Sequence, residues 1–543
     1  MLPVADSYAE LTAHFQWDIP EYYNIGADVC DKWAEAEPAR LALIHVAEDG
    51  TPEEYTFADI RRLSNHTANL LAAQGVAAGD RVAILLPQAP ETAYSHVAVY
   101  KLGAIALPLF TLFGTDALAY RLRDSGARAV ITNADGAAKL AGLRDDLPEL
   151  SLVLVVDGPA SDCLDFHALR QAQPADFTPV RTRADDPALI IYTSGTTGAP
   201  KGALHAHRVL LGHLPGVEMS HDFFPQPGDR IWTPADWAWI GGLYDVLMAA
   251  WHHGVPVVSR RFEKFDAPAA FQLMADHAVR NVFLPPTALK LMRTVDAPAE
   301  RWPYRLRSVA SGGETLGAEL LDWGRQTLGV TINEFYGQTE CNMIVSNCAA
   351  LLPVRPGVMG VAAPGHRVAI LDDFGRPLPP NTPGQIGVQR PDPVMFLEYW
   401  RNPQATQAKF IGDWLLTGDM GVMDEAGYIR FVGRNDDVIN SAGYRMGPGE
   451  IEDCLLGHPA VRMVAVIGVP DALRNEAVKA YIVLAPDYVA SDELAAAIQA
   501  YVKTQLAAHE YPRHIAFVDE LPLTTTGKIV RRALRAWHRD GVA

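Results

Sequence analysis

The chain has 543 residues, of which 49% are hydrophobic and 20% charged, a composition typical of a globular protein with a large buried core. The formal net charge of −18 disfavours a protein that coats nucleic acid or an anionic membrane, because both surfaces would repel it. Five cysteines without a CxxC pair favour free thiols in a reducing compartment over a disulfide framework or a zinc ribbon.

Neither a secretory signal nor a membrane span is expected from the apolar segments. The first 17 residues lack a basic segment followed by an apolar run. The most apolar long stretch, VAVYKLGAIALPLFTLFG, contains Lys101 and Pro108. It is better explained as helix, turn and buried strand, since a membrane span needs about 20 apolar residues. We therefore predict a cytoplasmic protein.

Helical periodicity alternates with short β-rich runs along the chain. Runs such as RVAILL and ARAVIT are typical of buried strands, and the alternation returns in residues 254–292 and 306–337. This order is that of βαβ units, so it predicts an α/β fold with mostly parallel sheets covered by helices. Ligands are then expected at the loops that leave the carboxyl ends of the strands.

The loop in IIYTSGTTGAPKG follows directly from an apolar strand and suits a phosphate group. Its glycines let backbone N–H groups approach closely, its hydroxyl groups add donors, and its lysine adds positive charge. A Walker A loop is disfavoured because Pro200 and Gly202 stand where that motif has Gly and Ser or Thr. The alternative is a flexible surface loop. The predicted phosphate-binding residues are Thr193, Ser194, Gly195, Thr196, Thr197, Gly198 and Lys201.

Two further segments carry groups suited to a nucleotide. In NEFYGQTE, just after the apolar strand VTI, Tyr336 can stack on a base, Thr339 can donate to a phosphate and Glu340 can bind Mg²⁺. In LLTGDMG, Asp419 can accept both hydroxyl groups of a ribose. Taken alone, each segment also fits an ordinary turn.

The sequence changes character between about residues 351 and 392, where short strands are broken by Pro and Gly. This pattern predicts a small antiparallel or barrel-like β subdomain. The C-terminal part combines β-rich runs with the helical segment SDELAAAIQAYVKTQLAAH, for which Ser491 is the expected N-cap. A small α+β domain is therefore predicted at the C-terminus.

The chain contains, in order, the motifs YTSGTTGAPKG, NEFYGQTE, WLLTGDMG, GRNDDVINSAGYRMGPGEIE and PLTTTGKIVRR. Over nearly the whole chain this set resembles the adenylate-forming superfamily, and most of all its medium-chain acyl-CoA synthetases. The resemblance implies a ligase that activates a carboxylic acid with ATP, as acyl-AMP with release of pyrophosphate, and then transfers the acyl group to CoA. It also implies an N-terminal domain over residues 1–433, a hinge at 434–436 and a mobile C-terminal domain over 437–543.

For ATP, the resemblance implies one set of binding residues. The loop from Thr193 to Lys201 would hold the β- and γ-phosphates, Thr339 would contact the α-phosphate, and Glu340 would hold Mg²⁺. Asp419 and Arg434 would hold the ribose. The residues expected to frame adenine, with Gly337 beside them, are Gly313, Glu314, Glu334, Phe335 and Tyr336.

Lys528 matches the catalytic lysine of the superfamily, which bridges the attacking carboxylate and the α-phosphate. Without that match it would be interpreted as a solvated lysine in a basic tail. Asp436 matches the hinge at which the C-terminal domain rotates between half-reactions. The residues then implied to face CoA are Ala442, Gly443, Arg445 and Lys503.

The resemblance places the acyl pocket beside Gly337, where acetate-specific relatives have a tryptophan. An open apolar tunnel is therefore predicted, and it favours longer acids because each buried methylene adds about 0.8 kcal/mol. Trp237 and Trp239 could equally belong to the core, and Cys341 and Asn342 depart from the TETG of many relatives. A benzoate-type aryl acid also fits. The expected lining residues are Trp239, Ile240, Leu243, Gly312 and Gly337.

Two other functions stay open. An acyl-AMP ligase that loads a carrier protein would differ by not turning over free CoA. A non-catalytic nucleotide-binding protein would lack at least one of the five side chains expected to bind ATP or to act in catalysis, yet all five are present in the sequence. The expected partners are the acid, ATP, Mg²⁺ and CoA, without nucleic acid, and the chain could be a monomer or a homodimer. The five groups are Lys201, Glu340, Asp419, Arg434 and Lys528.

Overall fold

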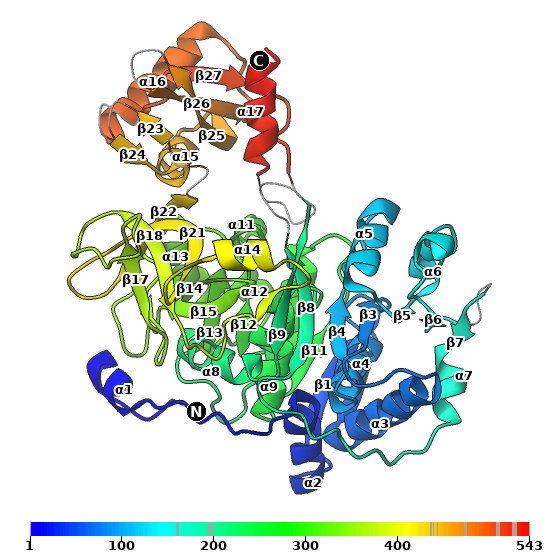
Figure 1. Ribbon diagram of the computed structural model, residues 1–543. Helices are drawn as coiled ribbons and strands as arrows, with labels where there is room; N and C mark the ends of the chain where they lie inside the picture. Colours follow the sequence, from blue (N-terminus) through cyan, green and yellow to red (C-terminus); the bar gives the residue numbers. More distant parts are fainter. Residues whose placement is uncertain are drawn as a thin grey trace. The chain divides into compact units, whose positions relative to one another are not determined.

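The computed structural model describes residues 2–158, 162–193, 199–434, 437, 439–441, 444–471, 475–506, 511–523 and 529–541. The chain forms two compact units, whose elements are labelled in Figure 1. The first comprises residues 1–356, 360–367 and 390–409, and the second comprises 357–359, 368–389 and 410–543. The predicted α/β fold with a small β subdomain and a C-terminal α+β part is confirmed. The boundaries at 433 and 437 stay a prediction.

The first unit contains an eight-stranded sheet. In spatial order its strands are β19 (Glu398–Tyr399), β9 (Lys201–Ala206), β8 (Pro187–Thr193), β4 (Ile105–Pro108), β3 (Arg81–Leu85), β5 (Ala129–Thr132), β6 (Leu152–Val155) and β7 (Leu164–Asp165). From β8 to β7 the neighbouring strands are parallel, whereas β8 and β9 form an antiparallel hairpin. β4, β5 and β6 are buried throughout, which explains why these runs are apolar at every position except Thr132.

A nine-stranded sheet forms the other half of the first unit. In spatial order its strands are β16 (Val361–Ala362), β15 (Cys341–Ser346), β14 (Ile332–Gln338), β13 (Ser308–Gly312), β12 (Asn281–Phe283), β10 (Ile231–Trp232), β11 (Val257–Ser259), β1 (Leu41–Val46) and β2 (Pro52–Thr56). The strands from β14 to β1 are parallel, so the expectation of mostly parallel sheets is confirmed.

Helices flank both sheets of the first unit (Figure 1). The longest, α3, begins at a capping box, because the Thr56 hydroxyl accepts from the amide of Asp59 while the Asp59 carboxylate accepts from the amide of Thr56. The α-helices are α1 (Tyr8–His14), α2 (Lys32–Ala36), α3 (Phe57–Ala73), α4 (Pro90–Lys101), α5 (Thr115–Ser125), α6 (Ala134–Ala141), α7 (Phe166–Gln171), α8 (Val209–Ser220), α9 (Ala249–His252), α10 (Ala267–Asp276), α11 (Pro286–Arg293), α12 (Pro298–Arg301), α13 (Ala318–Trp323) and α14 (Pro403–Ala408). Shorter π and 3-10 turns are η1 (Ala27–Asp31), η2 (Arg144–Asp146), η3 (Gly241–Met248) and η4 (Gly324–Leu328).

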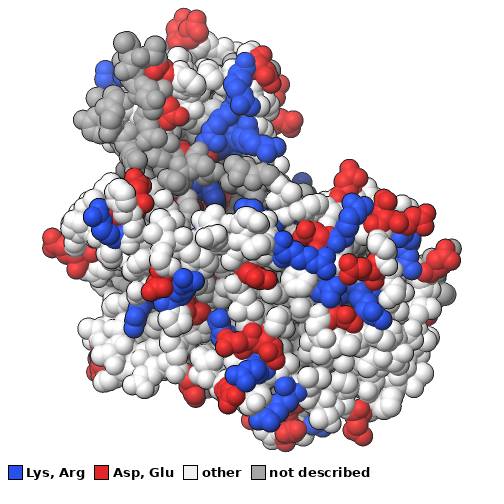
Figure 2. Space-filling view, viewed as in Figure 1, with Lys and Arg blue, Asp and Glu red and all other residues white. Residues whose placement is uncertain are grey.

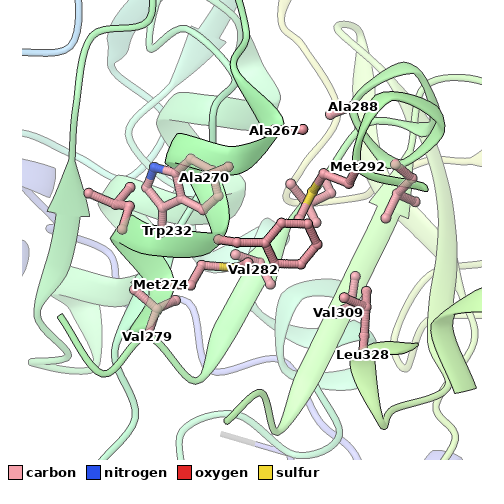
Figure 3. Packing of buried hydrophobic residues seen from close by; sticks show 14 of the residues in the cluster. Trp232, Ala267, Ala270, Met274, Val279, Val282, Ala288, Met292, Val309 and Leu328 are labelled. Carbon is pink, nitrogen blue, oxygen red and sulfur yellow. The ribbon is translucent and has the colours of Figure 1, made fainter. Parts of the chain in front are cut away.

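One large core cluster packs α10 and α11 onto the nine-stranded sheet. Figure 3 shows Trp232 of β10, Met274 of α10 and Met292 of α11 directed into the same interior. The ring of Phe271 stacks on Trp302 with a centroid separation of 5.6 Å. Each such side chain, fully withdrawn from water, stabilises the unit by about 1.5–3 kcal/mol, so this packing holds the carboxyl ends of the strands in place.

The second unit contains two small sheets. The first is antiparallel throughout, which confirms the predicted β subdomain, and consists of β17 (Val368–Leu371), β18 (Gly384–Gln389), β21 (Trp414–Met423), β20 (Phe410–Ile411) and β22 (Ile429–Arg434). The second consists of β24 (Tyr444–Met446), β23 (Ile439–Ser441), β26 (Asn475–Leu484), β25 (Val461–Asp471) and β27 (His514–Phe517). Its helices are α15 (Pro448–Leu456), α16 (Asp492–Gln505) and α17 (Arg531–Arg539).

A local sequence signal accounts for the start of α16 in the second unit. Ser491 caps this helix as predicted, since its side chain accepts from the amide of Leu494.

The five cysteines are all free thiols, as expected. None of the helices in the described part of the chain combines the length and apolar character that a bilayer crossing needs. On the face shown in Figure 2, basic and acidic side chains are interspersed over the first unit, so no field of a single sign covers that face.

Candidate active site

The predicted phosphate loop connects β8 to β9. Thr193 and Lys201 lie opposite each other in the register of this hairpin, and the Thr193 hydroxyl donates to the Lys201 carbonyl at 3.4 Å. Tyr120 of α5 donates its hydroxyl to the Pro200 carbonyl at 2.9 Å, which anchors the returning arm. The chain therefore places a threonine and a lysine at one end of the sheet. Ser194, Gly195, Thr196, Thr197 and Gly198 lie outside the described residues.

Lys201 and Glu340 are brought together by a residue that sequence reasoning missed, Tyr399. Lys201 Nζ lies 5.2 Å from the centre of the Tyr399 ring, and the Tyr399 hydroxyl donates to Glu340 Oε1. Tyr399 reaches this position because β19 pairs with β9, with Tyr399 opposite Ala203. The Glu340 side chain is almost wholly buried, so the arrangement presents a desolvated carboxylate beside an ammonium group. In the sequence, Tyr399 is one aromatic residue among several in FLEYW, and no spacing distinguishes it.

The segment NEFYGQTE differs from its expected form. Tyr336 and Gly337 were expected just after a strand that ends at residue 332, but β14 continues through Gln338. The strand continues because it pairs with β15 in an antiparallel hairpin, with Gln338 opposite Cys341. Thr339 and Glu340 therefore form the tight turn of that hairpin, so the pairing of β14 with β15 fixes the backbone position of both residues.

The five residues predicted to frame adenine lie on β14 or directly after the neighbouring parallel strand β13. Gly312 at the end of β13 is opposite Phe335 on β14, so Gly313 and Glu314 emerge beside Tyr336. Gly313 has φ +91°, a conformation that favours glycine. The Glu314 carboxylate accepts from the Thr287 hydroxyl at 3.3 Å. These strands thus place predicted residues from two separate motifs at one edge of the sheet.

Glu334 differs from the other members of this set by its burial. Only 4% of its surface is exposed, and its Oε1 accepts from the Leu316 amide at 3.4 Å. The carboxylate therefore ties β14 to the loop after β13, where the adenine ring is expected.

In the second unit, Asp419 and Arg434 are partners across β21 and β22. They are opposite in register, and Arg434 Nη1 lies 3.8 Å from Asp419 Oδ1. The Asp419 amide donates to the Thr417 hydroxyl at 3.1 Å, which fixes the backbone from which the carboxylate extends. The Asp419 side chain is mostly buried whereas Arg434 is 43% exposed. The two residues predicted to bind the ribose thus form an ion pair with each other.

The predicted acyl-pocket residues lie on η3, directly before it, and on β13 and β14. Ile240 and Leu243 are buried, and Trp239 lies beside a small hollow lined also by Phe110, with ring centroids 5.8 Å apart. Trp237 is fully buried, so it belongs to the core whereas Trp239 faces the hollow.

Gly312 and Gly337 are both required by close packing. A methyl group placed on Gly312 would lie 2.7 Å from the Phe335 ring. One placed on Gly337 would lie 2.5 Å from the Met343 amide nitrogen and 2.6 Å from Asn342 Oδ1. The Cys341 thiol is buried nearby, and that burial raises its pKa well above the ordinary value. The open tunnel beyond Gly337 stays a prediction.

The residues predicted for the second half-reaction lie in the second unit. Lys503 is exposed on α16, with Nζ 5.6 Å from the centre of the Tyr511 ring. The backbone of Arg445 belongs to β24, opposite Asn440. Leu523 and Ile529 form an antiparallel bridge on either side of the Lys528 segment. Outside the described residues lie Asp436, Ala442, Gly443 and Lys528.

Comparison with known proteins identifies the family. The model of AMP-binding enzymes matches residues 30–400, and the model of the AMP-binding enzyme C-terminal domain matches residues 450–528. The chain is 35% identical to Acyl-coenzyme A synthetase ACSM2, mitochondrial, of Rattus norvegicus, over 97% of this chain and 94% of that protein.

Two solved structures are similar over nearly the whole chain. The Brucella canis acyl-CoA synthetase has 35% identity and a TM-score of 0.76, and the alignment covers 99% of this chain and 100% of that one. The anthranilate CoA ligase AuaEII, solved in complex with anthranoyl-AMP, has 30% identity and a TM-score of 0.88, with coverages of 96% and 99%. The chain therefore belongs to the AMP-binding enzyme family and, within it, to the acyl-coenzyme A synthetases.

Proposed function

We propose that this protein is an AMP-forming acyl-CoA synthetase that activates a carboxylic acid with ATP and transfers the acyl group to CoA. The observation that carries the proposal is the cluster of Lys201, Tyr399 and Glu340 beside the Thr339 turn, in a chain that matches acyl-coenzyme A synthetases from end to end. In the first step an acid oxygen bonds to the α-phosphorus and the bond to pyrophosphate breaks. In the second step the CoA thiolate takes the acyl group and AMP leaves.

The residues of the first unit would act mainly through charge and position. Lys201 with the loop after Thr193 would neutralise the β- and γ-phosphates as pyrophosphate departs. Thr339, held in the hairpin turn, would donate to the α-phosphate. In the second unit, Asp419 would accept the ribose hydroxyl groups, with Arg434 fixing its orientation. These roles stabilise developing negative charge, which is where an enzyme gains most of its rate.

Glu340 suits a magnesium ion. Mg²⁺ prefers oxygen ligands and is usually held by one or two carboxylates together with substrate phosphates, and a buried carboxylate in a turn beside a phosphate-binding threonine fits that pattern. When bound, the ion would neutralise phosphate charge as a Lewis acid. Tyr399 would orient the Glu340 carboxylate for this role, since its hydroxyl occupies one carboxylate oxygen.

Replacing Tyr399 with phenylalanine tests this assignment. Loss of the hydroxyl should raise the Mg²⁺ concentration needed for half-maximal activity by about ten-fold, because outer-shell partners of a metal ligand typically contribute that much to affinity. Activity at saturating Mg²⁺ should change far less. The measurement is pyrophosphate release as a function of Mg²⁺ at fixed ATP.

A matched control for this substitution is Tyr304→Phe. Tyr304 donates its hydroxyl to the Thr327 carbonyl at 2.8 Å, away from the predicted phosphate site, so its Mg²⁺ dependence should equal that of the wild type. The orienting role of Tyr399 is wrong if both variants share the wild-type curve.

We propose a medium-chain fatty acid as the substrate, and an aryl acid as the second candidate. The first rests on Gly337, which leaves no bulky side chain at the position expected to limit acyl length. The second is favoured by the similarity to an anthranilate CoA ligase and by the Phe283 and Phe335 rings, whose centroids are 5.2 Å apart beside Gly312. A cytoplasmic location stays part of the proposal.

The decisive experiment for the function is a product assay. The purified protein is incubated with ATP, Mg²⁺, CoA and a panel of aliphatic and aromatic acids, and AMP, pyrophosphate and acyl-CoA are quantified. We expect equal amounts of the three products. Formation of ADP would overturn the proposed reaction, and single turnover without steady use of free CoA would indicate a carrier-protein ligase instead.

A further inference from the structure

A buried polar pair, Asp245 and Asn342, lies where an apolar acyl tunnel was expected. Asn342 Nδ2 donates to both carboxyl oxygens of Asp245, at 2.9 and 3.1 Å. Asp245 is 3% exposed and Asn342 is 5% exposed. Asp245 comes from η3, which carries Leu243, and Asn342 comes from β15, which pairs with β14 and its Gly337, so the pair ties η3 to this hairpin.

The close contacts of two glycines place this pair beside residues of the predicted acyl pocket. A methyl group on Gly337 would lie 2.6 Å from Asn342 Oδ1. One on Gly241 would lie 3.5 Å from Asp245 Oδ2 and 3.1 Å from the Phe283 ring. The polar pair therefore adjoins both the proposed length-limiting position and the aromatic wall. Because Asn342 is two residues beyond Glu340, the pair also lies near the end of the pocket where the reacting carboxylate is proposed to bind.

A third polar group behind the pair has unused hydrogen-bonding capacity. His213 is fully buried, and its Nε2 lies 3.8 Å from Asp245 Oδ1 without a hydrogen-bond partner among the residues that the structure describes. Its Nδ1 lies 2.7 Å from the Val209 carbonyl, so Nδ1 carries the proton and Nε2 presents a lone pair. Buried polar atoms without partners are costly, and their presence in a native protein calls for an explanation.

Burial favours the uncharged forms of this cluster. It raises the pKa of Asp245 well above its ordinary value and lowers the pKa of His213 to about 4. Both shifts oppose charge at this place, which suits an uncharged hydrogen-bonding group better than an ammonium ion.

We infer that Asp245 and Asn342 select acids that carry an uncharged hydroxyl or amino group within a few bonds of the carboxylate. This inference rests on the proposed function and names the class of acid within it. A plain alkyl or aryl acid would offer Asp245 and Asn342 no additional hydrogen bond, and a site built to hydrogen-bond a substrate group discriminates strongly against analogues that lack it. A pair that only ties η3 to β15 would affect stability without changing the choice of acid.

The test compares acids of equal size in the wild-type protein. The pairs are 2-aminobenzoate with 2-methylbenzoate, and 3-hydroxyhexanoate with 3-methylhexanoate, and kcat/KM is measured by acyl-CoA formation. We expect kcat/KM to favour the polar member by about ten-fold or more in at least one pair. Ratios below ten in both pairs overturn the inference while leaving the proposed function intact. A failure to form any acyl-CoA would instead count against the proposed function.

Variants assign the preference to the pair. Asp245→Ala combined with Asn342→Ala removes both partners and should bring the ratio close to one. The control is Asp392→Asn, which alters another buried pair, since Asp392 Oδ2 lies 2.7 Å from His366 Nδ1. It should lower stability and keep the wild-type ratio. An unchanged ratio in the folded double variant overturns the assignment, and if that variant does not fold, Asp245→Asn provides the same comparison.

Discussion

Replacing Lys528 with alanine should reduce acyl-AMP formation by about 10²–10³-fold while largely sparing thioester formation from supplied acyl-AMP. Lys528 matches the lysine that bridges the attacking carboxylate and the α-phosphate, and its ammonium group would lower their mutual repulsion only in the first half-reaction. The two steps are measured separately, by pyrophosphate release without CoA and by CoA consumption with synthetic acyl-AMP.

The substitution Lys503→Ala is the informative counterpart. Lys503 is exposed on α16 and is proposed to contact a phosphate of CoA, so this variant should raise the KM for CoA and leave acyl-AMP formation unchanged. Opposite effects of the two lysines would support a C-terminal domain that presents different residues in each half-reaction. Equal loss of both half-reactions in Lys528→Ala would contradict that division of roles.

Stability should fall steeply as the pH decreases below 6.5, because burial in the first unit strongly lowers the pKa of five histidines. Burial lowers the pKa of His213 to about 4 and that of the other four to about 3. In the unfolded chain each imidazole takes up a proton below its ordinary pKa of 6.5, whereas the folded protein excludes it, so protonation favours unfolding. The other four are His96, His205, His207 and His221.

The expected net loss is on the order of 3 kcal/mol between pH 6.5 and 5.5, since each such histidine, half-protonated in the unfolded chain at pH 6.5, contributes about 1 kcal/mol over this interval and two aspartates oppose it. Burial raises the pKa of Asp236 to about 6 and that of Asp245 well above its ordinary value, so protonation of these two carboxyl groups stabilises the folded protein as the pH falls. Urea unfolding at pH 7.5, 6.5 and 5.5 at constant ionic strength gives the free energy of unfolding directly.

Two histidine variants make this prediction specific. His96→Gln removes one buried imidazole, whose Nδ1 lies 3.2 Å from the Tyr100 hydroxyl. The slope of the free energy of unfolding against pH should decrease by the contribution of one bound proton. His14→Gln changes an exposed histidine in α1 and should leave the slope as it is. A free energy of unfolding that stays constant between pH 7.5 and 5.5 would contradict the prediction that the buried histidines destabilise the folded protein at low pH.

Motifs with local chemistry were predictable from the sequence. Ser491 caps α16 because a serine before an acidic first turn satisfies free amide groups whatever the tertiary context. The runs at β3 and β5 are apolar at nearly every position because parallel strands are buried on both faces. The end of β14 was placed wrongly, since its extension to Gln338 depends on pairing with β15 rather than on the residues of β14 alone.

The sequence by itself determined the α/β class, the family and the set of residues proposed to handle ATP, because glycine, hydroxyl and carboxylate groups in fixed order carry that chemistry locally. Only the tertiary structure decided which side chains surround them. Tyr399 reaches Glu340 from a strand that joins the edge of the sheet, and Asp245 meets Asn342 from an element far away along the chain. Such contacts arise because packing brings distant segments within hydrogen-bonding distance, and no periodicity or spacing in a single segment records which segments will meet.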